Sequence, residues 1–280
     1  FALNGYHGAI PVLTTDGYEN RLSKTNTARG DVRLTAVTTS AARATELRRA
    51  FSDPEVAGGI GSWEVLENPD ADAVARRLSD PEIDILYCGL PIEDGNSVTT
   101  ATGTVSLDEF DDAAALVVFE GATDRSVGIS MVESGGLSAI LTENALDQKS
   151  SRSLVGLLSL GFPVGASVGL SGVEKASETR IVGDPSSGIA SQVYLGMQIN
   201  VVQSESPTRH HIEHGSVPSL PSLLGMELEI LPDKFHSLSE LYGKTGRDGP
   251  TVDSAELLEI LEEGDSIVHF NGRILLPEDV

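Results

Sequence analysis

The segment ALVVFEGATDRSVGISMVESGGLSAILT, residues 115–142, contains two short apolar runs separated by a polar turn and a short helix-forming stretch. The runs Ala115–Glu120 and Gly136–Thr142 are nearly continuous in apolar residues, which is typical of strands buried on both faces. Residues Ile129–Glu133 between them predict a short helix. A strand, a helix and a second strand in this order predict a right-handed crossover within a parallel sheet.

The same alternation extends in both directions along the chain. Four more strands of this sheet are expected at Val32–Thr39, Trp63–Glu67, Glu82–Leu90 and Thr179–Asp184. Helices are expected between them at Ala41–Phe51, Asn68–Leu78, Ala145–Leu160 and Val164–Lys175. Residues Pro91–Leu107 contain the turn-forming pair Asp94-Gly95 and predict a hairpin excursion. The predicted fold is an α/β three-layer sandwich with a mainly parallel sheet over residues 31–190, preceded by a lead-in segment of residues 1–30.

A different pattern begins after Gly183-Asp184-Pro185. Strands without regular helices between them are expected at Gln192–Val202, Met226–Leu231, Asp265–Phe270 and Arg273–Leu276. The pair Asn271-Gly272 is a strong hairpin signal, and only Ser254–Glu262 has the pattern of a helix. Residues 191–280 therefore predict a small β-rich C-terminal extension.

The charge of the chain excludes several classes of partner. The 280 residues include 42 Asp and Glu against 19 Lys and Arg, which gives a formal net charge of −23. Such a chain repels phosphate backbones and anionic headgroups, so neither nucleic-acid binding nor electrostatic membrane binding is expected. The acid is spread along the whole chain and lysine is scarce. We therefore expect a cytoplasmic protein of an extreme halophile, in which concentrated salt screens the self-repulsion.

Two further features limit the class of protein. The single cysteine, Cys88, excludes an internal disulfide. The uncharged stretch Ser153–Val173 is long enough to span a membrane, but its glycines and serines favour buried helices of a globular core. Without an initiator methionine or a basic-then-apolar leader, the chain is expected to be a trimmed product or a fragment.

The order of these elements resembles the CHAT group of caspase-like cysteine peptidases, which includes relatives of gingipain and separase. The segment DILYCGLPIEDG, residues 84–95, resembles the strand that ends in Gly-His in that group. Residues 115–185 resemble the rest of its core, where one strand ends in the catalytic Cys and a final strand closes on Gly-Asp, here Gly183-Asp184. The similarity is closest to CHAT-like proteins of halophilic archaea.

The resemblance places the catalytic histidine at Leu90 and the catalytic cysteine at Ala122. Leucine cannot accept a proton and alanine cannot attack a carbonyl carbon, so the family's chemistry is not expected here. We therefore expect a pseudo-peptidase without a cofactor that binds protein partners as a regulatory or scaffold module.

The remaining polar groups at this edge of the sheet form a candidate vestigial pocket. Its members are Cys88, Glu93, Asp94, Glu120, Thr123, Asp124 and Arg125. One interpretation is a pocket in which Arg125 pairs with an anion; the other is a solvated acidic rim. Cys88 is expected to be a small buried hydrophobe, and the alternative is a relocated nucleophile.

Two other sites would make the chain a hydrolase of a different class. Ser167, within Gly165-Ala166-Ser167-Val168-Gly169, matches the nucleophile-elbow pattern, although the segment is expected to lie in a helix. His210 and His214 have the spacing of a partial metal site. The flanking Pro207 and Pro218 instead predict an exposed polar loop.

Overall fold

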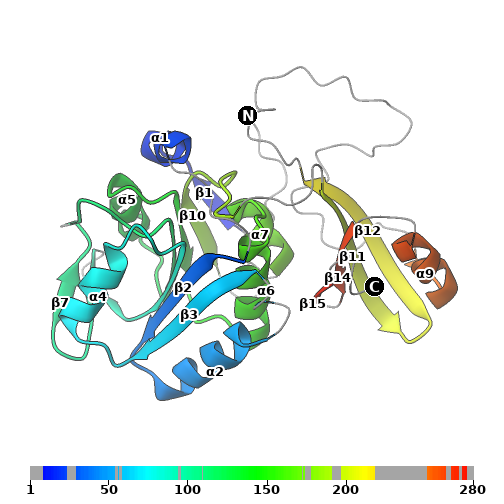
Figure 1. Cartoon of the computed structure of the whole chain (residues 1–280), viewed down its shortest axis with the longest axis horizontal. Helices are drawn as coiled ribbons and strands as arrows, with labels where there is room; N and C mark the ends of the chain where they lie inside the picture. The colour runs from blue at the N-terminus through cyan, green and yellow to red at the C-terminus, as the bar shows by residue number, and fades with distance from the viewer. Residues whose placement is uncertain are drawn as a thin grey trace. The chain divides into compact units, whose positions relative to one another are not determined.

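The computed structural model describes residues 9–23, 30–53, 56, 59–93, 96–108, 110–171, 173, 178–190, 197–217, 251–262, 266–270 and 273–275. The chain divides into two compact units (Figure 1). One is an α/β unit of residues 8–191, and the other is a β-rich unit of residues 192–280 together with residues 1–7.

A seven-stranded sheet forms the centre of the α/β unit, in the order β1-β10-β9-β8-β4-β2-β3. Its strands are β1 (Ala9–Val12), β2 (Val32–Thr38), β3 (Ile60–Glu67), β4 (Ile85–Gly89), β8 (Leu116–Glu120), β9 (Ser138–Thr142) and β10 (Thr179–Gly183). The five strands from β3 to β9 run parallel, whereas β10 is antiparallel to β9 and parallel to β1. The prediction of a mainly parallel sheet with six of these strands is confirmed.

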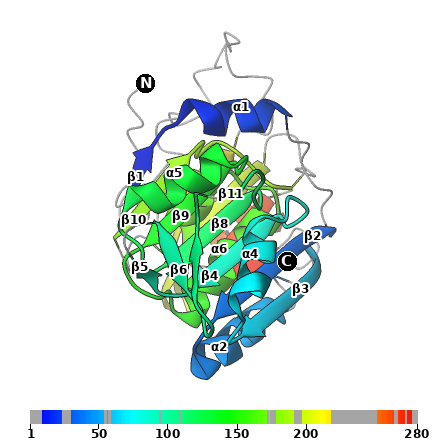
Figure 2. The ribbon, with the colours of Figure 1, turned by 90° about the vertical axis from the view of Figure 1, so that its left-hand side faces the viewer.

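Helices cover both faces of this sheet. Helices α2 (Ala41–Phe51), α6 (Gln148–Ser159) and α7 (Val164–Ser171) form one layer, and α4 (Ala71–Leu78) and α5 (Arg125–Glu133) form the other. Figure 2 shows α4 and α5 in front of the sheet. The three-layer α/β sandwich expected from the sequence is confirmed.

Aspartate caps explain where three helices begin. Asp70, Asp124 and Asp147 each accept a hydrogen bond from a backbone N–H in the first turn of α4, α5 and α6. Helix α4 therefore begins at Ala71, directly after its cap Asp70, and not at the predicted Asn68. The helix α5 begins four residues before the predicted Ile129, and α6 begins three residues after the predicted Ala145.

The lead-in segment contains two elements that are part of the α/β unit. Strand β1 extends the sheet beside β10, and α1 (Thr15–Ser23) follows it. The side-chain amide of Asn20 donates to the carbonyls of Val132 and Gly136, both at 2.8 Å. Gly17 lies so close to the backbone of Gly183 that a Cβ atom at residue 17 would be 2.8 Å from the Gly183 Cα.

The predicted hairpin excursion is a small antiparallel sheet. It consists of β5 (Ile92–Glu93), β6 (Ser97–Thr99) and β7 (Thr104–Ser106). The turn pair Asp94-Gly95 lies outside the described residues.

The β-rich unit contains a five-stranded sheet in the order β13-β12-β11-β14-β15. Its elements are β11 (Met197–Ser206), β12 (Arg209–Val217), β13 (Thr251–Val252), β14 (Ser266–Phe270) and β15 (Arg273–Leu275), with the predicted helix α9 (Ser254–Glu262). Buried Val202, Ile212, Leu257 and Val268 form its core. The β-rich extension is confirmed, while the strand expected at Met226–Leu231 lies outside the described residues.

The histidine cluster corrects one prediction. Residues 210–214 were expected in an exposed loop, but they lie in β12, and the His210 side chain is buried. Pro207 occupies the tight turn between β11 and β12, so this proline marks the end of a strand rather than a long loop. Pro218 lies outside the described residues.

The uncharged stretch Ser153–Val173 does not form one continuous helix. Residues Leu160–Pro163 separate α6 from α7, and both helices are largely buried. In the part of the chain that the structure describes, no helix has both the length and the apolarity that crossing a bilayer requires.

Candidate functional site

The register between β4 and β8 divides the candidate residues between two faces of the sheet. Tyr87 lies opposite Val118, and Cys88 lies opposite Phe119. Because successive side chains of a strand point to opposite faces, Tyr87 and Glu120 share one face and Cys88 lies on the other. The first face packs under α2 and α6, and the second under α4 and α5.

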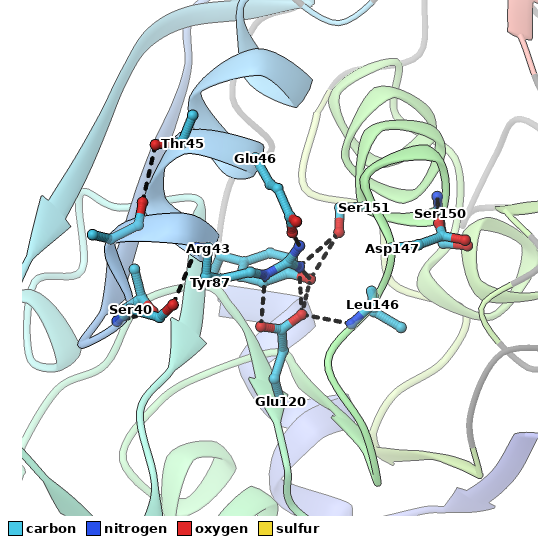
Figure 3. A network of polar contacts seen from close by, with 12 residues as sticks. Ser40, Arg43, Thr45, Glu46, Tyr87, Glu120, Leu146, Asp147, Ser150 and Ser151 are labelled. Carbon is cyan, nitrogen blue, oxygen red and sulfur yellow. Dashed lines mark hydrogen bonds and ion pairs between the residues drawn. The ribbon is translucent and has the colours of Figure 1, made fainter.

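A buried polar network surrounds Glu120 on the face under α2 and α6 (Figure 3). We call it the Glu120 network; it consists of Arg43, Tyr87, Glu120, Ser151 and the backbone N–H of Leu146. Arg43 donates to both carboxylate oxygens through Nε and Nη2. The Tyr87 hydroxyl donates to Glu120 Oε1 at 2.6 Å, and the Leu146 N–H donates to the same oxygen at 2.8 Å.

The serine completes this network. Arg43 Nη2 lies 2.9 Å from both the Tyr87 hydroxyl and Ser151 Oγ. Because the tyrosine proton is donated to Glu120, the Ser151 hydroxyl donates to Tyr87 across 3.1 Å. The network thereby joins α2, β4, β8 and the start of α6.

Local backbone structure positions the two charged members. Arg43 lies in the first turn of α2, where the Ser40 hydroxyl accepts from the Arg43 N–H. Gly89, at the end of β4, leaves room for the Glu120 carboxylate, because a Cβ there would lie 3.1 Å from Glu120 Oε2. The side chains of Arg43 and Glu120 are only 8% and 6% exposed.

The electrostatics of this network keep its protons in place. Burial, followed by the negative charge of Glu120, raises the pKa of Tyr87 well above its ordinary value, so the phenol remains a donor. Burial alone lowers the pKa of Arg43, but Tyr87 and Glu120 outweigh burial and raise it. A carboxylate that already accepts from a guanidinium, a phenol and a backbone amide is a poor general base. The arrangement is chemically a structural ion pair.

The two positions at which the resemblance places a catalytic pair follow the ends of β4 and β8, and both carry hydrocarbon. Leu90 is 1% exposed and Ala122 is 3% exposed. Both belong to one apolar cluster with the fully buried Cys88, between the sheet and helices α4 and α5. Neither position presents a polar atom of a side chain.

The only cysteine is protected from reaction. Burial raises the pKa of Cys88 from 9.0 to about 12, although a hydrogen bond from the Leu90 backbone opposes this shift. A thiol is a nucleophile only as the thiolate, so this sulfur is inert in the folded chain. The sequence of residues 8–191 also contains no histidine. The placement therefore favours the small buried hydrophobe over the relocated nucleophile.

Four of the remaining members of the candidate pocket lie at the surface, and the fifth, Asp94, lies outside the described residues. Glu93 is exposed on β5. Asp124 caps α5, and the hydrogen bond from the Ser126 N–H lowers the pKa of its carboxyl group. Thr123 and Arg125 are also exposed, and the Thr123 carbonyl accepts from Arg180 at 2.7 Å. These residues match the solvated rim, whereas Glu120 is buried and belongs to the Glu120 network.

The arginine that meets the buried carboxylate was missed by sequence reasoning. Arg43, not Arg125, pairs with Glu120. A signal was present in the sequence, because Arg43 occupies the same face of α2 as the buried Leu47 and Ala50. A charged residue on an apolar helix face indicates a buried partner.

The two sites considered for another hydrolase class lie elsewhere. Ser167 is inside α7 and fully buried, and its hydroxyl donates to the Phe162 carbonyl at 3.5 Å, so it does not stand on a strand-to-helix turn. His210 is buried on β12, and the side chain of His214 lies outside the described residues. A search of the described positions finds no group of three or more His, Cys, Asp or Glu able to hold a metal ion.

No model of a known protein family matches this sequence, and no curated protein is significantly similar to it. The family resemblance therefore depends on the order of the segments and on the identity of the residues at their ends.

Proposed function

We propose that the chain is a catalytically inactive relative of the CHAT group of caspase-like cysteine peptidases. In this proposal the α/β unit serves as a binding, regulatory or scaffold module for other proteins in the salt-rich cytoplasm of a halophile. The site needs no cofactor, since binding of a protein partner requires no bond to be made or broken.

The order of the elements supports the family assignment. The strand that resembles the cysteine-bearing strand, β8, ends at Glu120, two residues before Ala122. An apolar strand, β9, and two helices, α6 and α7, follow in the chain. The last of these strands, β10, ends at Gly183 and is followed by Asp184. This is the sequence of elements that the resemblance implies.

One observation carries the inference of inactivity: both positions of the catalytic pair lie in the apolar cluster. The register Cys88–Phe119 pairs β4 with β8, and Leu90 and Ala122, which follow these two strands, belong to the same apolar cluster. A histidine or cysteine alone at such a buried place would leave a polar group unpaired, whereas two apolar residues leave none.

A gain of reactivity tests the assignment of these two positions. We expect Leu90→His combined with Ala122→Cys to react with iodoacetamide at residue 122 at least tenfold faster than Ala122→Cys alone, because a nearby imidazole lowers the pKa of a thiol. The matched control is Leu90→His combined with Ala113→Cys, at another buried alanine of the same cluster. Equal rates in the two double variants would show that residues 90 and 122 are not a former catalytic pair.

The unmodified chain provides the test of inactivity. We expect no thiol-dependent cleavage of a mixed fluorogenic peptide library at any pH between 5 and 9. Cleavage that is abolished by Cys88→Ala would overturn the proposal.

A further inference from the structure

A serine–histidine–serine arrangement lies in the β-rich unit, remote in sequence from Leu90, Ala122 and the Glu120 network. His210 on β12 lies opposite Ser204 on β11 and opposite Val252 on β13. Helix α9 begins directly after β13, and its first residue is Ser254. Strand pairing on one side and the start of a helix on the other thus bring both serine hydroxyls to the same imidazole.

The distances in this arrangement are those of hydrogen bonds. His210 Nε2 lies 3.1 Å from Ser254 Oγ, and His210 Nδ1 lies 2.8 Å from Ser204 Oγ. The imidazole is buried at 6% exposure, and Ser254 is half-buried. A nucleophile within hydrogen-bond reach of a base, with the base oriented by a third group, is the arrangement used in nucleophilic catalysis.

We propose that Ser254 and His210 form a nucleophile–base pair that accepts an acyl group from small esters, with Ser204 as the residue that positions the imidazole. In the structure the Ser254 hydroxyl donates to the Pro207 carbonyl at 2.9 Å; in the reactive tautomer, with a proton on Nδ1, the imidazole donates to Ser204 and the Ser254 hydroxyl turns to donate to Nε2. This assignment uses residues of the β-rich unit only, so it is independent of the proposed inactivity of the α/β unit.

The reaction balances without any other component of the protein. Ser254 Oγ forms a bond to the ester carbonyl carbon while its proton passes to His210 Nε2. The bond from that carbon to the leaving oxygen then breaks, and the imidazolium returns the proton to the departing alcohol. Water, activated by the same imidazole, hydrolyses the serine ester and regenerates Ser254.

The surroundings predict a slow reaction. Asp253 caps α9 by accepting from the backbone N–H groups of Ala255 and Glu256, so these amides are not free to bind an oxyanion. The Ser254 hydroxyl has a second acceptor, the Pro207 carbonyl at 2.9 Å, which competes with the imidazole for its proton. We therefore expect Ser254 to accept an acyl group from activated esters, and the resulting serine ester to be hydrolysed slowly.

The test is covalent labelling of the full chain with a small alkyl fluorophosphonate. The Ser254 oxygen forms a bond to phosphorus, fluoride leaves with the bonding electrons, and the proton passes to His210. We expect a single adduct in the intact mass and its location at Ser254 by peptide mapping. Ser254→Ala should abolish the adduct, whereas the matched control Ser206→Ala, on the same hairpin, should leave it unchanged.

The role of the base is measured by rates. A general base contributes about 10²–10⁴-fold, so His210→Gln should slow labelling by about 100-fold or more. For the positioning residue, Ser204→Ala should slow labelling and Ser204→Thr should restore it, because threonine keeps the hydroxyl. If His210→Gln does not fold, the comparison of Ser204→Ala with Ser204→Thr decides the question, because these two variants differ in the hydroxyl that orients the imidazole.

Absence of an adduct at Ser254 would overturn the proposal. So would a labelling rate that is the same with and without a hydroxyl at residue 204. Neither result bears on the inactivity of Cys88, which the peptidase assay measures separately.

Discussion

Replacing Arg43 with methionine removes the only guanidinium that neutralises Glu120 within the Glu120 network. Methionine fills similar volume but donates no hydrogen bond, so the buried carboxylate retains only the Tyr87 hydroxyl and the Leu146 N–H as donors. Removing one partner of a buried ion pair costs ~3–5 kcal/mol of folding free energy. Both side chains are buried, so solvent does not weaken the pair and the full figure applies. At 2–4 °C per kcal/mol, the unfolding midpoint of the α/β unit should fall by roughly 6–20 °C.

Arg48→Met in the same helix is the matched control. Arg48 pairs with Glu67 at 3.5 Å, and their side chains are 43% and 37% exposed. Exposed pairs of this kind contribute ~0–1 kcal/mol, so the control should shift the midpoint by a few degrees at most. Thermal unfolding followed by circular dichroism at fixed molar salt measures both variants. Equal shifts for Arg43→Met and Arg48→Met would refute the inference that the Glu120 network stabilises the α/β unit.

A double-mutant cycle separates the pair from the burial of each partner. Glu120→Gln alone leaves Arg43 facing a neutral amide, and the double variant Arg43→Met with Glu120→Gln has no uncompensated charge. We expect the double variant to be more stable than the sum of the single changes by about 1–3 kcal/mol, as found for residues within one network. Additive changes would show that the two residues act independently.

Four further outcomes follow from the sequence and the structure. Cys88 should react with iodoacetamide only when the chain unfolds, so the alkylation rate should increase with urea in step with the loss of circular dichroism. The folded pKa of Cys88 is about 12 against 9.0, so its stabilising contribution is complete below pH 9 and is lost as the pH rises toward 12. That loss amounts to about 4 kcal/mol at most, and Cys88→Ala should remove this part of the pH dependence of urea unfolding. Asn20→Ala leaves the carbonyls of Val132 and Gly136 without this donor and should destabilise the α/β unit by about 1–3 kcal/mol in urea. A chain of net charge −23 should melt at higher temperature in molar than in millimolar potassium chloride, and an unchanged midpoint would contradict the halophilic origin.

The strands of the large sheet were predictable because burial on both faces produces uninterrupted apolar runs. Residues Leu116–Glu120 and Ser138–Thr142 are buried throughout, as their sequences indicate. Helix α1 had no such signal, because it contacts the unit through Gly17, Asn20 and Arg21 rather than through an apolar stripe. Contacts of that kind depend on a partner surface that is distant in sequence.

The dependence on contacts between residues distant in sequence also explains what sequence reasoning missed at the candidate sites. Arg43 and Glu120 are 77 residues apart, and only the adjacency of α2 to the end of β8 brings them together. The flanking Pro207 and Pro218 predict a loop for the histidine cluster, yet alternation along β12 buries His210 and Ile212 on one face. A single proline marks a turn, and the sequence on either side decides whether strands flank it.

The Glu120 network and the apolar cluster lie in different layers of the α/β unit, so the fold does not depend on polar side chains at residues 90 and 122. Tyr87 and Glu120 stabilise the layer of α2 and α6, whereas Leu90 and Ala122 pack under α4 and α5. Because residues 90 and 122 follow the ends of β4 and β8 and belong to the apolar cluster, substitutions there should leave the ion pair of Arg43 and Glu120 intact. Replacing only one member of a buried catalytic pair would leave the other member without its hydrogen-bond partner, so replacing both gives the more stable fold. On this reasoning Leu90→His alone should destabilise the α/β unit, and Ala122→Cys in the same chain should recover part of that loss.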